Sequence, residues 1–187
     1  MRPTYTPMVG SQAQGDAPEL GDQIAELLPR LVGFARSLTH DPEEAADLAQ
    51  ETIARALGAA WRFTPGTNLR AWLFRIMRNL HLNQVRDGAA RPRIESLQEL
   101  REAAGVDARL GFSPVEKHAI ERASLDAVRQ ALAKLPERYA VPIHLVCVEE
   151  LSYAETAAVL SVPIGTVMSR IYRGRRLLAA GLAGGWR

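Results

Sequence analysis

The chain has 187 residues, a formal net charge of +2 and one cysteine, which allows one or two small domains and excludes an internal disulfide. Its four histidines stand far apart and away from cysteines or carboxylates at ligand spacing, so we expect no metal and no cofactor. No apolar run reaches the roughly 18 residues of a membrane span and the N-terminus lacks a signal-peptide core, so we expect a cytoplasmic protein without membrane insertion.

The N-terminal part is predicted to be a leader followed by helices. Residues 1–17 are rich in proline, glycine and polar side chains and are expected to be disordered. Apolar residues at helical spacing predict a first helix over residues 20–38, bent at Pro29. Asp41 is a good N-cap, and the proline that follows it suits the first turn of a second helix that ends near residue 60.

Further helices are predicted on both sides of a linker. Asn68 can cap a third helix. The apolar stripe of that helix consists of Leu69, Trp72, Leu73, Ile76 and Leu80. From residue 87 to residue 115 the periodicity weakens while glycine, proline and charges accumulate, which predicts a linker. Helical patterns resume over residues 116–134 and 136–148.

The helix expected over residues 136–148 contains two residues with structural predictions. Pro142 lies inside it, lacks a backbone N–H and should bend it. Cys147 stands in an apolar run and is expected to be buried. Since no segment alternates with a period of two, the predicted fold class is all-α: two small helical domains, residues 18–86 and 116–187, joined by a flexible linker.

The pattern over residues 152–176 is typical of a helix-turn-helix. Ser152 and Glu155 have the spacing of a capping box, and Pro163 breaks the chain before a second helix. Four positions of that helix should face the core, namely Val167, Ile171, Gly174 and Leu178. The neighbouring face should be exposed to duplex DNA and carries Thr166, Ser169, Arg170, Arg173, Arg175 and Arg176. Because no acidic residue follows Thr156, nothing in this segment cancels the attraction of its arginines to phosphate.

A second group of residues interleaves aromatic rings and arginines. Trp61, Phe63 and Trp72 alternate with Arg62 and Arg70. Proteins that hold single-stranded nucleic acid combine stacking surfaces with a cationic track. Burial in the core is the favoured interpretation for Trp72, whereas Phe63 lies in a turn and is more open. The outward face of the following helix carries Arg75, Arg78, Asn79 and Arg86.

A third group is acidic. Glu43, Asp47 and Glu51 follow one another at a spacing of four residues in the second helix. Like charges at this spacing cost roughly 0.2–0.5 kcal/mol per pair, and Asp47 and Glu51 lie beyond the stabilising reach of the helix N-terminus. A partner surface rich in arginine and lysine would offset this cost. Residues 47–52 are therefore either a protein docking face or a merely solvated face, and both interpretations stay open.

Four motifs together resemble the extracytoplasmic-function (ECF) class of the sigma-70 family. They are DPEEAADLAQETIARAL, FTPGTNLRAWLFRIMRNL, LPERYAV and LSYAETAAVLSVPIGTVMSRIYRGRRLL, in the order and spacing of that class. The resemblance covers about residues 20–86 and 120–182. It implies an alternative sigma factor that binds core RNA polymerase, recognises and melts promoter DNA and initiates transcription, for a stress or envelope response under an anti-sigma factor. FTPGTNLRAWLF occurs both in the general-stress group and in groups controlled by zinc-containing anti-sigma factors, so the anti-sigma class stays open.

The resemblance also implies a role for each group of residues. Asp47, Gln50 and Glu51 match the docking site for the clamp helices of the polymerase. The loop over residues 63–68 matches the loop that captures a base flipped from the minus-ten element. The helix that carries Arg75, Arg78 and Asn79 matches the helix beside the melting DNA. The minus-ten residues are thus Phe63, Thr67, Asn68, Arg75, Arg78 and Asn79. The helix from Ile164 matches the one that reads the minus-thirty-five element, through the six polar residues from Thr166 to Arg176 given above.

Other functions remain possible on the sequence. A conventional repressor or activator would use the same helix-turn-helix without an acidic docking helix. A sigma mimic that titrates an anti-sigma factor could lose its DNA-reading arginines, whereas this chain keeps Arg170, Arg173, Arg175 and Arg176. An enzyme is the weakest option, because no nucleophile, base and orienting group cluster in the sequence, and no small-molecule substrate is expected.

Overall fold

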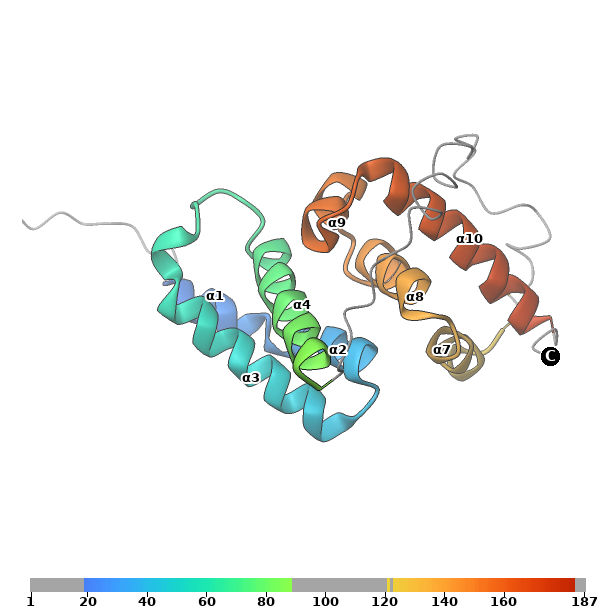
Figure 1. The fold of residues 1–187 in the computed structure, drawn as a ribbon, viewed down its shortest axis with the longest axis horizontal. Coiled ribbons are helices and arrows are strands. Elements are labelled where there is room, and N and C mark those ends of the chain that lie inside the picture. Colours follow the sequence, from blue (N-terminus) through green and yellow to red (C-terminus); the bar gives the residue numbers. More distant parts are fainter. Residues whose placement is uncertain (1–18, 89–120, 122, 184–187) are drawn as a thin grey trace, which may run out of the picture.

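The structure, a computed structural model, describes residues 19–88, 121 and 123–183 (Figure 1). Every regular element within these residues is a helix, which confirms the predicted all-α fold class. The leader predicted over residues 1–17 and most of the linker predicted over residues 87–115 lie outside the described residues. None of the described helices combines the length and the hydropathy that a membrane crossing requires.

Two helices stand where one bent helix was predicted. Helix α1 (Leu20–Glu26) ends at Leu27, and α2 (Leu28–Thr39) begins directly after it. Pro29 occupies the first turn of α2, where its missing N–H leaves no helical hydrogen bond unmade. The proline therefore separates two helices instead of bending one.

The next two helices begin at the predicted caps. The Asp41 carboxylate accepts hydrogen bonds from Glu43 N at 2.8 Å and Glu44 N at 3.0 Å, and α3 (Pro42–Gly58) follows it. After a short 3-10 turn, η1 (Ala60–Arg62), the amide oxygen of Asn68 accepts from Ala71 N at 3.2 Å and starts α4 (Leu69–Gly88). Because α4 runs to Gly88, the first two residues assigned to the linker are helical.

Helices α7 (Leu125–Ala133) and α8 (Glu137–Ile143) open the C-terminal half. Ser124 caps α7, and of the helix predicted over residues 116–134 the stretch before residue 121 lies outside the described residues. Pro142 comes one residue before α8 ends, and the chain continues as a π-helical turn, η2 (His144–Val148). The expected disturbance at Pro142 is thus a change of helix type.

The prediction that Cys147 is buried is wrong, because its side chain is exposed. In the wider π turn only Leu145 is buried, and the residues after it rotate outward. The chain then forms α9 (Tyr153–Leu160) and α10 (Ile164–Leu182), the two helices of the predicted helix-turn-helix.

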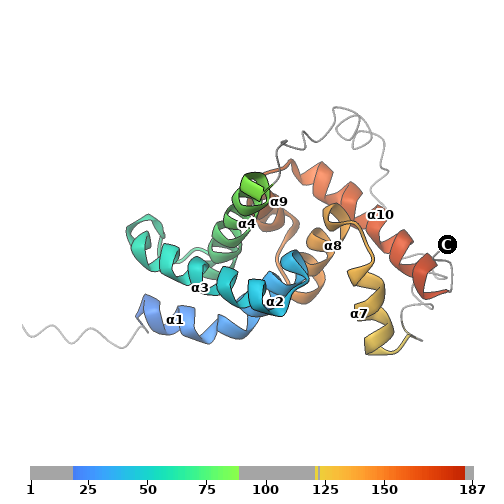
Figure 2. The same cartoon turned by 60° about the horizontal axis from the view of Figure 1, so that its bottom comes forward.

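The two helical halves pack against each other. Helix α4 contacts α9, and α2 contacts α8, so the helix-turn-helix lies beside the N-terminal helices (Figures 1 and 2). One apolar core runs through both halves and includes Phe34 and Phe74 on one side and Leu145 and Ile171 on the other. Sequence patterns predicted two helical domains joined by a linker, and the contact between these domains places two candidate DNA-binding segments side by side.

Candidate nucleic-acid interface

The acidic residues of α3 lie on its outer face. Asp47 and Gln50 are exposed, and Glu51 is partly exposed and forms an ion pair with Arg55 at 3.2 Å. The opposite face of α3 is buried and consists of Ala45, Leu48, Ala49, Thr52 and Ala56. The three predicted docking residues therefore share one surface that a basic partner can reach.

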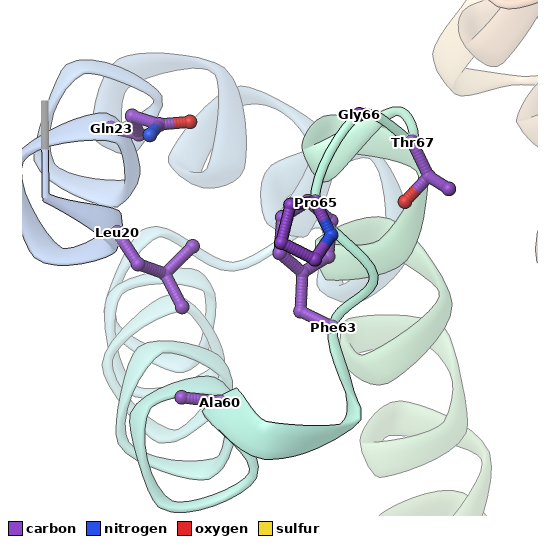
Figure 3. Close-up of a pocket in the computed structure, with 7 residues that line it drawn as sticks. All are labelled: Leu20, Gln23, Ala60, Phe63, Pro65, Gly66 and Thr67. Atoms are coloured by element: carbon purple, nitrogen blue, oxygen red, sulfur yellow. The ribbon is translucent and has the colours of Figure 1, made fainter. Parts of the chain in front are cut away.

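A pocket lies between α1 and the loop that precedes α4 (Figure 3). Its volume is about 470 Å³. Its lining consists of Leu20, Gln23, Ala60, Phe63, Pro65, Gly66 and Thr67. The loop is held in shape by Gly66, whose φ of +86° favours glycine, and by the Thr67 hydroxyl, which donates to Thr64 O at 2.7 Å. Thus the FTPGTN segment forms one wall of a preformed cavity.

The aromatic residues around this loop have different roles in the structure. Phe63 and Trp72 are both partly buried, with ring centroids 5.3 Å apart, and they pack against the core. The core interpretation of Trp72 is confirmed, and Phe63 is at once a core contact and part of the pocket wall.

Trp61 belonged to the aromatic group noted in the sequence but not to the predicted minus-ten residues, and 78% of its surface is exposed. The Arg62 guanidinium lies 4.8 Å from its ring centroid. Because Trp61 sits in η1, the helical phase of α3 gave no indication that its ring points outward. An exposed ring with a bound guanidinium, directly before the pocket loop, is a stacking surface of the kind that holds unpaired bases.

The polar residues of α4 occupy the face away from its core stripe. Arg75, Asn79 and Arg86 are exposed and Arg78 is partly exposed. The sequence contains no acidic residue between Glu51 and Asp87. Burial lowers the pKa of the neighbouring His81, so its ring adds no charge at neutral pH. Arginine therefore supplies the positive charge of this face.

The helix-turn-helix forms as its sequence predicts. Glu155 N donates to Ser152 Oγ at 3.1 Å, and Ser152 N donates to Glu155 Oε2 at 2.8 Å, which completes the capping box. Ser161 ends α9 in the left-handed region with φ of +55°, and Pro163 is the N-cap of α10. The four predicted core positions of α10 are all buried: Val167, Ile171, Gly174 and Leu178.

The prediction that the whole polar face of α10 is exposed is wrong for three residues. Only 7% of Thr166, 4% of Ser169 and 7% of Arg170 is exposed. The Ser169 hydroxyl donates to Thr166 O at 3.0 Å, so it is used within the helix. Helical spacing gives the direction in which each side chain points. It does not say how much of the helix circumference is buried, and more of it is buried along the first half of α10.

Further along α10 the predicted arginines are more accessible. Arg173 and Arg175 are partly exposed, and Arg176 is exposed with its guanidinium 5.9 Å from the Tyr172 ring centroid. Arg175 Nη2 lies 3.8 Å from Cys147 Sγ. This end of the helix is therefore more exposed than its first half.

The structure also joins a residue predicted to act at the minus-ten element, Asn68, to the capping box of the helix-turn-helix. Asn68 Nδ2 donates to Glu155 Oε1 at 2.6 Å, which connects the pocket loop to the helix-turn-helix. Beside this bond Glu149 is buried next to Arg30 and His144. Burial by itself raises the pKa of Glu149, but hydrogen bonding and charge from His144 and Arg30 outweigh it and hold that pKa below its ordinary value.

The described residues bring no group of three or more His, Cys, Asp or Glu side chains into a metal-binding arrangement. The described surfaces combine an acidic face on α3, a pocket of about 470 Å³ beside the FTPGTN loop, and a helix-turn-helix with arginines. Such surfaces bind macromolecules through charge, stacking and hydrogen bonds.

Comparison with known proteins assigns these segments. Residues 24–91 match the family model for sigma-70 region 2, and residues 125–178 match the model for sigma-70 region 4. The ECF RNA polymerase sigma factor EcfG of Rhodopseudomonas palustris is 36% identical over 162 residues, which are 86% of this chain and 83% of that protein. The ECF sigma factor SigE of Mycolicibacterium smegmatis is 34% identical over 91% of this chain and 64% of its own length.

A solved structure agrees with this assignment. The sigma factor RpoE from Bartonella quintana, in a complex with the anti-sigma factor NepR, is 31% identical and superposes with a TM-score of 0.64. The match covers 89% of this chain and 97% of that one. With region 2 supplying the acidic helix and pocket loop, and region 4 the helix-turn-helix, the chain belongs to the ECF class of the sigma-70 family and is an RNA polymerase sigma factor, a transcription initiation factor.

Proposed function

We propose that this alternative sigma factor binds core RNA polymerase through α3, opens the promoter with the pocket loop and reads the upstream element with α10. The observation that carries the proposal is the position of Asp47, Gln50 and Glu51 on one accessible face of α3, whose C-terminal end leads directly into the pocket loop. A conventional repressor has no use for this acidic face. A sigma factor needs it next to the segment that handles DNA.

The pocket suits a single flipped base. Its volume of about 470 Å³ lies within the roughly 300–1,000 Å³ of small-ligand sites. Phe63 offers a ring for stacking and Thr67 a hydroxyl for hydrogen bonding. Separating the strands costs roughly 1.4 kcal/mol of stacking per base-pair step, so a captured base lowers the tendency of the strands to reanneal.

Polar residues on the outer face of α4 position the separated DNA strand. Arg75, Arg78 and Asn79 follow the loop along one helix face, and phosphate contacts from such a face fix the register of the strand without reading its sequence. Trp61, which directly precedes the loop in the sequence, adds an exposed ring. The assignment of Phe63, Thr67 and Asn68 to the minus-ten element comes from the family resemblance, and this arrangement supports it.

Reading of the minus-thirty-five element is assigned to α10. Arg173 and Arg175 are partly exposed and Arg176 is exposed, and phosphate or guanine contact is assigned to them, whereas Thr166, Ser169 and Arg170 must become uncovered before they reach base edges. In the described conformation, helix α10 therefore exposes only some of the residues that are assigned to DNA reading.

Control by an anti-sigma factor is the second part of the proposal. The relative RpoE was solved in a complex with the anti-sigma factor NepR, and the match to it covers nearly the whole of that chain. An anti-sigma partner that binds both halves would keep this chain away from core polymerase.

Run-off transcription with purified core polymerase tests the proposal. Asp47→Arg with Glu51→Arg should abolish binding to core polymerase, measured by gel filtration, and abolish promoter-specific transcripts. The matched control is Asp22→Arg with Glu26→Arg, which makes the same charge change at the same spacing on the exposed face of α1. Retained core binding by the α3 variant, or equal loss in the control, removes the docking assignment.

A further inference from the structure

Helix α1 forms the wall of the pocket that faces the FTPGTN loop. Leu20 and Gln23 are three residues apart on this helix, so their side chains share one of its faces, and both line the pocket. Figure 3 shows them across the cavity from Phe63 and Pro65 of the loop. The neighbouring Ile24 is buried in the core and fixes α1 in this position. The structure therefore brings a glutamine amide to the space proposed for a flipped base.

The pocket offers few polar side chains to a ligand. Among the described residues that line it, Gln23 and Thr67 have polar side chains, and the others are apolar or glycine. The Thr67 hydroxyl already donates to Thr64 O at 2.7 Å, which leaves its oxygen as an acceptor. Gln23 is therefore the side chain in this lining that can offer N–H groups to a base in the pocket.

A glutamine amide is well suited to the edge of an unpaired base. It carries two N–H donors and a carbonyl oxygen with two lone pairs, so a contact on one side leaves capacity for others. The pairing edge of each DNA base has a donor next to an acceptor, and one amide can bind both. Proteins that extrude a base read this edge through hydrogen bonds while apolar or aromatic side chains hold the ring. Phe63, Pro65 and Leu20 supply such a surface around Gln23.

We propose that Gln23 of α1 hydrogen-bonds the base captured in the pocket and is a specificity-determining residue for one position of the minus-ten element. This inference rests on the proposed function of the pocket loop. It adds a reading group from a helix that precedes the loop in the chain, whereas the sequence assigned the minus-ten contacts to the loop and to α4. Sequence spacing gave no indication of it, because α1 and the loop meet only in the folded protein.

Two substitutions change the chemistry of this side chain while nearly keeping its size. Gln23→Glu replaces the donors with acceptors, and Gln23→Met removes the hydrogen-bonding groups. The matched control is Gln130→Glu, the same chemical change at an exposed position of α7 in the other half of the chain (Figure 1). Circular dichroism and gel filtration with core polymerase confirm that each variant folds and docks.

Base preference is measured on the holoenzyme, which consists of core RNA polymerase and the full-length chain. A promoter that the unaltered holoenzyme transcribes is first selected from genomic fragments. Its minus-ten element is then fully randomised, and the transcribed region receives a barcode. Sequencing of the run-off transcripts gives the preference for each base at each position of the element.

The two Gln23 variants should change the same single position. We expect Gln23→Met to flatten the base preference there by about fivefold or more, which is the lower end of what a bidentate contact contributes. Gln23→Glu should disfavour thymine there by about fivefold relative to the bases that carry an exocyclic amino group, because thymine has none to donate to the carboxylate. Gln130→Glu should leave every preference unchanged.

Unchanged preferences in both Gln23 variants would overturn the inference, and so would changes spread over several positions or an equal change in Gln130→Glu. A variant that docks on core polymerase but makes no transcripts is assayed instead by sequencing the library fraction that its holoenzyme retains in a gel shift, with the same expectations. If the unaltered holoenzyme starts no transcription from any fragment, the proposed function itself fails. Transcription whose base preferences do not depend on Gln23 leaves the proposed function standing and removes only this inference.

Discussion

Gly174 of α10 lies directly against Tyr139 of α8. A Cβ atom placed on Gly174 would stand 3.1 Å from Tyr139 Cβ and 2.7 Å from the end of the Ile143 side chain. The absence of a side chain at this position lets the recognition helix approach α8 closely, and it places α10 on the rest of the C-terminal half.

We expect Gly174→Val to lower the free energy of unfolding by about 1–3 kcal/mol, because its methyl groups must displace Tyr139 and Ile143. Urea unfolding followed by circular dichroism measures the change. The control is Gly33→Ala in α2, where an added Cβ would meet nothing within 4 Å, and this change should raise the stability by roughly 0.5–1 kcal/mol. A Gly174→Val protein as stable as the unaltered chain would mean that α10 can shift away from α8.

Trp61 should matter for DNA and little for folding. Since its ring is mostly exposed, Trp61→Ala should change the free energy of unfolding by less than about 0.5 kcal/mol. Stacking of a base on an aromatic ring contributes about 1–3 kcal/mol, so the variant should open promoters poorly when permanganate reactivity of unpaired thymines is measured in the polymerase complex. Trp61→Phe should retain most of the opening.

The partly buried Trp72 provides the contrast for this experiment. Trp72→Ala should destabilise the protein by about 3 kcal/mol because the ring packs against Phe63 and the core. If Trp61→Ala instead prevents binding to core polymerase, the ring contacts the enzyme and not the DNA.

The shape of the pocket loop depends on Gly66. Its φ of +86° is unfavourable for any residue with a Cβ, so Gly66→Ala should cost roughly 1–2 kcal/mol or shift the loop. We expect weakened promoter opening with unchanged binding to core polymerase, since the docking face lies on α3. Gly165→Ala at the start of α10 serves as the control, because its added Cβ has open space. Normal promoter opening by Gly66→Ala would show that the loop adapts without functional loss.

The capping box should make stability depend on pH. Hydrogen bonds from the Ser152 hydroxyl, the Ser152 N–H and Asn68 lower the pKa of Glu155 below its ordinary value of 4.5. A carboxyl group whose pKa is lower in the folded than in the unfolded protein stabilises the fold above the unfolded pKa, and this contribution disappears as the pH falls through the folded pKa.

Glu155→Gln should therefore lower the free energy of unfolding by about 1 kcal/mol near pH 7, and the difference from the unaltered chain should shrink below about pH 4. Urea unfolding at a series of pH values measures it. The matched control is Glu26→Gln, which replaces an exposed carboxylate on α1. A difference that stays constant down to pH 3 would mean that the Glu155 charge contributes nothing through these hydrogen bonds.

Local sequence patterns predicted most of the helices and their starts. Asp41, Asn68 and the Ser152 and Glu155 pair act as caps because the side chain and the backbone N–H that it binds are two or three residues apart. The first helix was predicted less well. Pro29 is compatible with both a bend and a new helix start, and only the packing of α1 and α2 distinguishes them.

The exposure of individual side chains was predicted less well than the side of the helix on which they lie. The core stripe of α10 follows from helical spacing, but burial of Thr166, Ser169 and Arg170 depends on how many sides of the helix are covered. Cys147 was misplaced for a related reason, because a π turn changes the angle between successive side chains. The exposure of Trp61 depends likewise on the short 3-10 turn that carries it.

The sequence by itself determined that the chain is helical, that it carries an acidic helix, an FTPGTN loop and a helix-turn-helix, and that these motifs resemble those of a sigma factor. Each of these features depends on residues within about one or two helical turns of one another. The tertiary structure alone decided that Asn68 binds Glu155 and that Glu149 is buried against Arg30, because these partners are 87 and 119 positions apart. Spacing along a helix sets the direction of a side chain, but the partner that it meets depends on how the whole chain packs.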